Sequence, residues 1–234
     1  MKPLDGQWIV ITGASKGLGR EMALVLAEAG GHLILTARSG DLLENVAGRA
    51  RDLGVQCITV VGDLCDADVL ERVKALALDK RIDILVNNAG IVDITPLEDV
   101  PDSRVRNVIE INLLVPIQLT RAVIGMFKRR QAGVIVNVNS AGGKRPVPQH
   151  TIYCASKYGL NGFLEALKLE VKGLGIRLLN ICPGKMATNL FAAAGRDLDT
   201  EHFIRPREIA ESVLHLLALG PQCSHAELAV DRTS

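Results

Sequence analysis

The chain has 234 residues, of which 48% are hydrophobic but only 3% aromatic, and 22 are glycine. This length suits one large α/β domain and is too short for two domains of full size. The formal net charge of +1 argues against a function that depends on an acidic polymer, so no nucleic-acid partner is expected.

The cysteines give no sign of a metal site or a disulfide framework. There are five of them, scattered and never spaced as Cys-x-x-Cys, so we predict neither zinc nor paired disulfides. The first residues lead directly into a strand-like run without the apolar core of a signal peptide, and no apolar stretch looks long enough to span a bilayer. A cytoplasmic protein without a membrane partner is therefore expected.

Short apolar runs rich in β-branched residues alternate with longer stretches of helical periodicity. Strands are predicted at residues 8–12, 32–37, 55–61, 82–86, 133–139 and 176–182, with a last edge strand at 227–230. Helices are predicted at residues 18–29, 42–53, 69–78 and 206–219. This alternation is typical of a doubly wound (Rossmann) parallel sheet of about seven strands with helices on both faces, forming a single α/β domain over residues 1–234.

A glycine-rich loop follows the first predicted strand. Residues 12–19 read Thr-Gly-Ala-Ser-Lys-Gly-Leu-Gly, a Gly-x-x-x-Gly-x-Gly spacing that differs from the commoner Gly-x-Gly-x-x-Gly fingerprint. Glycines in a strand-to-helix turn let the backbone approach a pyrophosphate, and the helix N-terminus supplies N–H donors. The alternative is a tight turn without a ligand, but the position directly after the first strand favours a dinucleotide site.

The end of the second predicted strand indicates which dinucleotide binds. Ala37 stands where an NAD-selective site would place a carboxylate for the ribose hydroxyls. The guanidinium of Arg38 can pair with a 2′-phosphate in a bidentate manner, and Lys16 can add a second positive charge. We therefore favour NADP(H) over NAD(H); the alternative is that both residues are solvated surface cations.

Tyr153 and Lys157 stand one helical turn apart, downstream of Ser140 in the run Asn-Val-Asn-Ser-Ala-Gly-Gly. A free phenol titrates near pH ~10 and needs a fixed positive charge to act as an acid-base catalyst at neutral pH. Lys157 can supply that charge, while the Ser140 hydroxyl can hold a carbonyl or alcohol oxygen against the phenol. Taken alone, an ordinary helix pair is the alternative.

These motifs, together with Asp63, the run Asn-Asn-Ala-Gly at residues 87–90, Asn112 and the Pro-Gly step at 183–184, resemble the classical short-chain dehydrogenase/reductase family. The resemblance covers residues 8–219, nearly the whole chain. It implies that Tyr153 donates or accepts the proton, that Ser140 anchors the substrate oxygen, that Lys157 stabilises the phenolate and binds ribose hydroxyls, and that Asn112 completes a water-mediated proton relay. Asn112 as the cap of a helix break remains an alternative.

The resemblance also implies a cofactor site that runs along the carboxyl ends of the strands. Asp63 with Leu64 would contact the adenine, residues 88–90 would line the cleft, and residues 181–188 would fix the nicotinamide. The full set is Gly13, Ser15, Lys16, Gly17, Leu18, Gly19, Arg38, Asp63, Leu64, Asn88, Ala89, Gly90, Tyr153, Lys157, Pro183, Gly184 and Thr188. Asn87 and Asn88 as simple turn formers are the alternative.

Two irregular segments follow predicted strands at the edge where open α/β sheets bind ligands. We predict that residues 141–151 form a substrate-contacting loop and that residues 185–205 form a mobile lid; connectors of no special role are the alternative. Their apolar side chains predict a partly apolar pocket: Val147, Ile152, Leu190, Phe191 and Phe203. His150 is close enough in sequence to touch a substrate, yet a loop histidine with no partner in view is more often a surface residue.

The sequence therefore predicts an oxidoreductase that transfers a hydride between NADP(H) and a carbonyl or secondary alcohol, with reduction as the favoured direction. The alternatives are an NAD-dependent alcohol or sugar-type dehydrogenase, and a non-catalytic NADP(H)-binding redox sensor, which would have no need of the phenol. The chain ends without the Asp-Gly-Gly segment that in many reductases of the family helps to seal a tetramer. A homodimer or homotetramer is expected.

Overall fold

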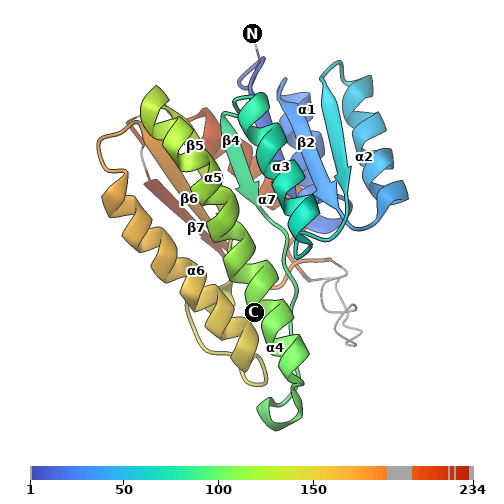
Figure 1. Ribbon diagram of the computed structural model, residues 1–234, viewed down its shortest axis with the longest axis vertical. Helices are drawn as coiled ribbons and strands as arrows, with labels where there is room; N and C mark the ends of the chain where they lie inside the picture. Colours follow the sequence, from blue (N-terminus) through green and yellow to red (C-terminus); the bar gives the residue numbers. More distant parts are fainter. Residues whose placement is uncertain (1, 189–201, 221, 224, 232–234) are drawn as a thin grey trace.

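The computed structural model describes residues 2–188, 202–220, 222–223 and 225–231. Seven parallel strands form one sheet in the order β3-β2-β1-β4-β5-β6-β7 (Figure 1). They are β1 (Trp8–Thr12), β2 (His32–Ala37), β3 (Cys57–Val61), β4 (Ile84–Asn87), β5 (Gly133–Val138), β6 (Ile176–Pro183) and β7 (His225–Val230). The predicted doubly wound sheet is confirmed, including the last edge strand, with boundaries that shift by up to two residues.

Helices cover both faces of the sheet. The helices α1 (Gly17–Glu28), α2 (Gly40–Asp52) and α7 (Pro206–Ala218) pack into one hydrophobic core. The helices α3 (Ala67–Asp79), α5 (Val115–Arg130) and α6 (Thr151–Glu170) pack into the other and face the viewer in Figure 1. The helix α4 (Asp102–Ile109) extends beyond the strand ends in the same view.

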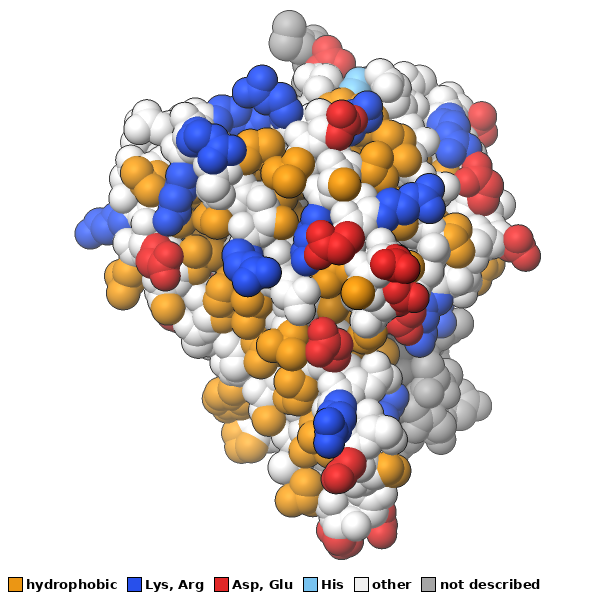
Figure 2. Space-filling view, in the orientation of Figure 1, with side chains coloured by type: hydrophobic (Ala, Val, Ile, Leu, Met, Phe, Trp, Pro, Cys, Tyr) orange, Lys and Arg blue, Asp and Glu red, His pale blue; other side chains and the backbone are white. Residues whose placement is uncertain are grey.

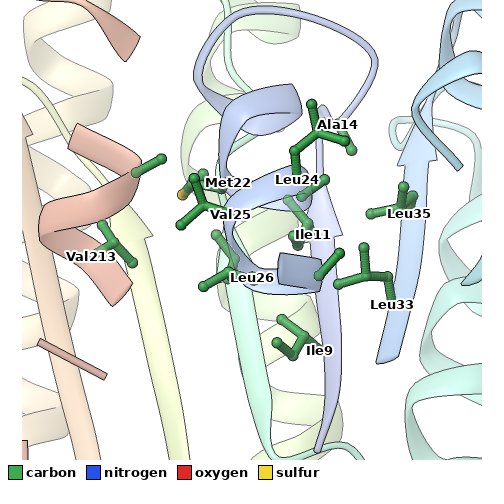
Figure 3. Close-up of a cluster of buried hydrophobic side chains, with 14 of the residues drawn as sticks. Ile9, Ile11, Ala14, Met22, Leu24, Val25, Leu26, Leu33, Leu35 and Val213 are labelled. Carbon is green, nitrogen blue, oxygen red and sulfur yellow. The ribbon is translucent and has the colours of Figure 1, made fainter. Parts of the chain in front are cut away.

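The central strands are buried on both faces, which explains their continuous apolar sequence. In β1, Ile9 and Ile11 belong to the core on the side of α1, whereas Val10 between them belongs to the opposite core, as the two-residue period of a strand requires. Figure 3 shows Ile11 beside Leu24 of α1, and Ile9 below it on the side of Leu33 of β2. The strand ends that border the ligand edge are thus held by dense packing on both sides.

Residues 102–130 form one continuous helix, in which a π-helical turn at Glu110–Leu114 joins α4 to α5. This 29-residue helix contains an 18-residue window with a mean hydropathy of 1.5, so it is long and apolar enough to cross a membrane by length and composition alone, which corrects the expectation that no such stretch exists. Within the protein, 44% of that window is buried. A stripe at every fourth position faces the core: Val115, Leu119, Val123 and Phe127.

The outer surface of this helix layer carries exposed apolar side chains. Leu114, Tyr158 and Leu169 are 39%, 44% and 75% exposed. Figure 2 shows hydrophobic side chains gathered over the lower and left parts of this face, with charged groups between them. This face therefore carries apolar side chains that are not buried in either hydrophobic core.

Candidate active site

A cavity opens where the order of the strands reverses. β1 and β4 are neighbours in the sheet although β2 and β3 lie between them in sequence, and open α/β sheets bind ligands at the carboxyl ends of such a pair. The cavity has a volume of about 780 Å³. Its walls contain every predicted cofactor-binding residue and three of the four predicted catalytic residues, Ser140, Tyr153 and Lys157; Asn112 does not line it.

The glycine loop closes tightly against the neighbouring strand end. Gly13 and Gly17 have φ angles of +67° and +56°, in the left-handed region. A Cβ atom at Gly19 would lie 2.3 Å from the carbonyl oxygen of Gly13 and 2.5 Å from Nδ2 of Asn88. Only glycine fits there without a shift of the backbone. This close approach places the start of α1 directly at the cavity.

The first turn of α1 carries no acidic residue and no side-chain cap. Its unpaired N–H groups and the positive end of the helix dipole are therefore left for a ligand. This arrangement fits the pyrophosphate of a dinucleotide.

Thr12 joins the ends of β1 and β4. Its Oγ1 accepts hydrogen bonds from the backbone N–H groups of Asn88 and Ala89, both at 2.9 Å, and Nδ2 of Asn88 donates to the carbonyl oxygen of Thr12 at 2.8 Å. Asn88 is thus a strand-to-strand connector and not only a turn former. Asn87 is buried away from the cavity, where its Nδ2 donates to Oδ1 of Asn137 at 2.9 Å. Thr12 was not among the predicted site residues.

Two cations border the nucleotide end of the cavity, Lys16 and Arg38. Nη1 of Arg38 lies 3.8 Å from Oδ2 of Asp63, and these side chains are 69% and 45% exposed. So long and exposed an ion pair contributes little, which leaves the guanidinium available to a phosphate. Ala37 at the end of β2 adds no carboxylate to this wall, so Lys16 and Arg38 are available to a phosphate group.

The helix α6 presents Tyr153 and Lys157 to the centre of the cavity. Nζ of Lys157 lies 5.9 Å from the centroid of the Tyr153 ring and donates to the carbonyl oxygen of Val138 at 2.9 Å. Its other two N–H groups have no partner among the residues that the structure describes. Oγ of Ser140 accepts from the N–H of Gly142 at 3.0 Å, so its own hydrogen can be donated to a substrate oxygen.

Burial controls the ionisation of this pair. It raises the pKa of Tyr153 to about 12, against which the hydrogen bond with Ser140 acts. It also lowers the pKa of the Lys157 ammonium to about 8. We expected Lys157 to lower the pKa of the phenol; in the structure, desolvation has the largest effect on that pKa, and the opposing interaction is the hydrogen bond with Ser140. At neutral pH the phenol is therefore protonated, which is the form that donates a proton.

Asn112 is fully buried in the π-helical turn, behind the cavity wall. Its Oδ1 accepts from the N–H of Ile91 at 2.9 Å, and its Nδ2 donates to the carbonyl oxygen of Ile91 at 2.9 Å and to Oγ of Ser156 at 3.0 Å. Ser156 in turn donates to the carbonyl oxygen of Tyr153 at 2.7 Å. The Asn112 side chain thus ties the segment after β4 to α6. A proton relay at this residue stays a prediction and would have to use its backbone atoms.

The substrate end of the cavity combines apolar and charged groups. Its apolar wall consists of Ile91, Val92, Ile94, Val147, Pro148 and Met186. Arg145 and Lys185 add positive charge, and Arg145 forms an ion pair with Asp231 after β7. Val147 lines the cavity as predicted, whereas Ile152 and Phe203 do not.

The predicted lid at 185–205 is described only at its two ends. Met186 and Ile204 form a β-bridge there, and the N–H of Ala187 donates to the carbonyl oxygen of Ile204 at 2.9 Å. Residues 189–201, including Leu190 and Phe191, lie outside the described part of the chain. Thr188 meets the glycine loop, since a Cβ atom at Gly17 would lie 3.4 Å from its Cγ2.

A buried ion pair anchors the segment after β4. Asp93 is 5% exposed, and its Oδ2 accepts from Nε of Arg104 on α4 at 2.7 Å, while Nη2 of Arg104 donates to the carbonyl oxygen of Val92 at 2.8 Å. Burial alone would raise the pKa of Asp93, but the hydrogen bond from Arg104 holds that pKa below its ordinary value. The pair fixes Val92 in the cavity wall. Asp93 lies three residues after the Asn-Asn-Ala-Gly run, but no motif includes Asp93 or Arg104, and neither residue was predicted.

Comparison with known proteins agrees with this geometry. The short chain dehydrogenase family model matches residues 7–199, so the chain belongs to that family. It is 34% identical over 193 residues to the very-long-chain 3-oxoacyl-CoA reductase of Bos taurus, covering 80% of this chain and 62% of the relative. It is 33% identical to dehydrogenase/reductase SDR family member 7B of Xenopus tropicalis, covering 88% of this chain and 72% of the relative. The chain thus spans about three fifths of the length of the oxoacyl-CoA reductase.

Solved structures resemble nearly the whole chain. A metagenomic short-chain oxidoreductase in complex with NADP has a TM-score of 0.86 at 30% identity, covering 99% of both chains. The short-chain dehydrogenase of Sphingobium yanoikuyae in complex with NADPH has a TM-score of 0.87 at 29% identity, covering 96% of this chain and 87% of that one. The likeness in fold, including the Rossmann-type sheet, therefore extends over nearly the whole chain.

The glycine contact gives a first prediction. Gly19→Ala should weaken NADPH binding at least about tenfold, because the methyl group forces the loop away from Asn88. Fluorescence titration of NADPH measures this. Gly48→Ala in α2, where nothing lies within 4 Å of the added Cβ, is the control and should bind NADPH normally. Equal affinity of Gly19→Ala and the wild type for NADPH would contradict the role of the glycine loop in binding the cofactor.

The Asp93–Arg104 pair gives a second prediction. Arg104→Ala should lower the free energy of unfolding by about 2 kcal/mol, because a buried carboxylate loses its partner. The stability that the lowered Asp93 pKa contributes is present above the pKa of the unfolded carboxyl and is lost as the pH falls through the folded value.

Urea denaturation at several pH values should therefore show the deficit of Arg104→Ala shrinking as the medium becomes more acidic. Arg106→Ala, on the exposed side of the same helix, is the control and should stay within about 0.5 kcal/mol of the wild type. A deficit that does not change with pH would show that the pair acts only through packing.

Proposed function

We propose that the protein is an NADP(H)-dependent reductase of carbonyl compounds, with oxidation of secondary alcohols as the reverse reaction. The observation that carries this proposal is the buried, protonated phenol of Tyr153 beside Ser140 and Lys157. These groups line the same cavity as the glycine loop and the N-terminus of α1. A redox sensor without turnover would have no use for such a group.

The residues present suffice for a concerted reduction. NADPH, when bound, would supply the hydride that adds to the carbonyl carbon. Ser140 donates a hydrogen bond that positions the carbonyl oxygen and keeps its own proton, and Tyr153 transfers its phenolic proton to the same oxygen, so that C=O becomes CH–OH. The phenolate that remains takes up a proton from solvent. Lys157 would hold the ribose hydroxyls of the cofactor through its two unused N–H groups, and its charge stabilises the phenolate as it forms.

The choice of NADP(H) rests on Arg38 and Lys16. Both line the nucleotide end of the cavity, and the ion pair of Arg38 with Asp63 is weak enough to be replaced by a phosphate. Two solved structures that resemble this chain contain NADP or NADPH. Because cells generally keep NADPH for reduction, the same residues support reduction as the working direction.

For the substrate we propose a chemical class and not a single compound. The wall of small apolar side chains accepts ketones, quinones, steroids and acyl thioesters alike, since such side chains discriminate weakly. One relative is named as a 3-oxoacyl-CoA reductase, which makes 3-oxoacyl thioesters a necessary member of any substrate panel.

We also propose that the protein is a homo-oligomer, with a second copy covering the outer face of α5 and α6. The exposed Leu114, Tyr158 and Leu169 support this occupant, because apolar helix faces of this kind are typical of interfaces between subunits. A cytoplasmic location stays a prediction that cell fractionation would check.

The decisive measurement is the rate of NADPH and NADH oxidation by purified protein with a panel of ketones, diketones and acyl thioesters. Turnover with NADPH should be abolished by Tyr153→Phe. Arg38→Ala should raise the KM for NADPH by about 10- to 100-fold with little effect on NADH, because a charge-assisted pair with the 2′-phosphate is lost.

Equal kinetics of the wild type with both cofactors would favour an NAD-dependent dehydrogenase instead. Tight NADPH binding without turnover of any substrate would favour the sensor.

The ionisation of the pair predicts opposite pH profiles for the two directions. Reduction needs the protonated phenol and charged Lys157, so its kcat should stay level up to pH about 8 and decline above it as the ammonium loses its proton. Oxidation needs the phenolate, whose fraction grows as the pH rises below the raised pKa of Tyr153, so the oxidation rate should rise with pH across the neutral range. Steady-state rates in both directions measure this; a reduction rate that increases with pH would contradict the assigned role of the phenol.

A further inference from the structure

His150 is placed at the reacting centre, although its position in a loop made it look like a surface residue. It directly precedes α6 and lines the cavity. The centroids of its ring and the Tyr153 ring are 6.2 Å apart, with an interplanar angle of 69°. The imidazole therefore borders the space in which a substrate bound to the Tyr153 phenol must lie.

The backbone around His150 is a tight turn. The N–H of His150 donates to the carbonyl oxygen of Val147 at 3.2 Å, with Pro148 at the second position. Gln149, at the third position, has a φ angle of +62°. These are the features of a type II turn, whose third position favours glycine. A glutamine held in the left-handed region is the kind of local strain that is retained where a ligand is bound.

The imidazole is held in one orientation and one tautomer. Its Nδ1 lies 2.7 Å from the carbonyl oxygen of Pro148. A carbonyl oxygen can only accept, so Nδ1 carries the hydrogen, and in the neutral ring Nε2 is an acceptor. The carbonyl oxygen of His150 also accepts from the N–H of Cys154 at 2.7 Å. Nε2 has no hydrogen-bond partner within the part of the chain that the structure describes.

We propose that His150 determines substrate specificity, with Nε2 accepting a hydrogen bond from a hydroxyl or N–H group on the carbon next to the reacting carbonyl. This inference rests on the proposed reductase function and deepens it, since it names hydroxyketones and related donor-bearing carbonyl compounds as the preferred substrates. A fixed acceptor that borders the reacting centre discriminates against an analogue without the donor, because the acceptor then loses water and gains no partner. The apolar side chains of the wall cannot make that distinction.

The test compares two substrates and two variants. The substrates are the ketone of the panel that the wild type reduces fastest and its analogue with a hydroxyl on the adjacent carbon. His150→Asn keeps an amide that can donate to Pro148 but removes the atom at the Nε2 position, whereas His150→Gln extends an amide oxygen towards that position. In His150→Asn, kcat/KM for the hydroxyketone should fall on the order of tenfold, with less than about a twofold change for the plain ketone. His150→Gln should recover part of the loss.

An equal fall for both substrates, in either variant, would show a structural role and overturn the inference, as would an unchanged preference. NADPH titration of each variant verifies that the cofactor half of the cavity is intact. If the wild type reduces no member of the panel, the proposed function fails and this inference fails with it. If plain ketones are reduced and the preference does not depend on His150, only this inference fails.

Discussion

The close junction between the ends of β1 and β4 is the constraint on which the rest of the site depends. Gly19 lies so near Gly13 and Asn88 that a Cβ atom has no room, and Thr12 binds the backbone of the next strand. This contact aims the N-terminus of α1 into the cavity and places the segment after β4 beside α6. A looser junction would separate the two halves of the ligand site before any catalytic residue was changed.

The centre of the cavity differs from this junction, because burial and not close backbone contact determines the ionisation of its Tyr153 and Lys157 side chains. Desolvation raises the pKa of Tyr153 and lowers that of Lys157, so at neutral pH the phenol is firmly protonated whereas the ammonium is closer to losing its proton. The hydrogen bond from Lys157 to Val138 and the Asn112–Ser156 connection limit how α6 can shift. The fold thus keeps a neutral phenol in place until hydride transfer creates the need for a proton.

Sequence patterns predicted the features that depend on short stretches of the chain. The alternating strands and helices, the glycine loop and the Tyr153–Lys157 spacing follow from chain periodicity and steric needs, and the structure confirms the sheet and brings these residues to one cavity. The Asp93–Arg104 pair, the Arg145–Asp231 pair and the hydroxyl of Thr12 were not predictable, because each joins segments far apart in the chain or depends on burial. The ionisation of Tyr153 was misjudged for the same reason: desolvation is a property of the packed molecule.

The two ends of the cavity differ in how their contacts determine selectivity. Arg38 is largely exposed and held by one long ion pair, so the choice of cofactor depends on a residue that can change without disturbing the buried pair. His150 is positioned by the hydrogen bond between its Nδ1 and the carbonyl oxygen of Pro148 and by the contact of its ring with Tyr153. A substitution at His150 therefore alters the reacting centre directly. Binding energy from the nucleotide end can hold the cofactor in place, whereas discrimination among carbonyl substrates has to come from a few rigid polar atoms beside the phenol. Nε2 of His150 is positioned to be one of them.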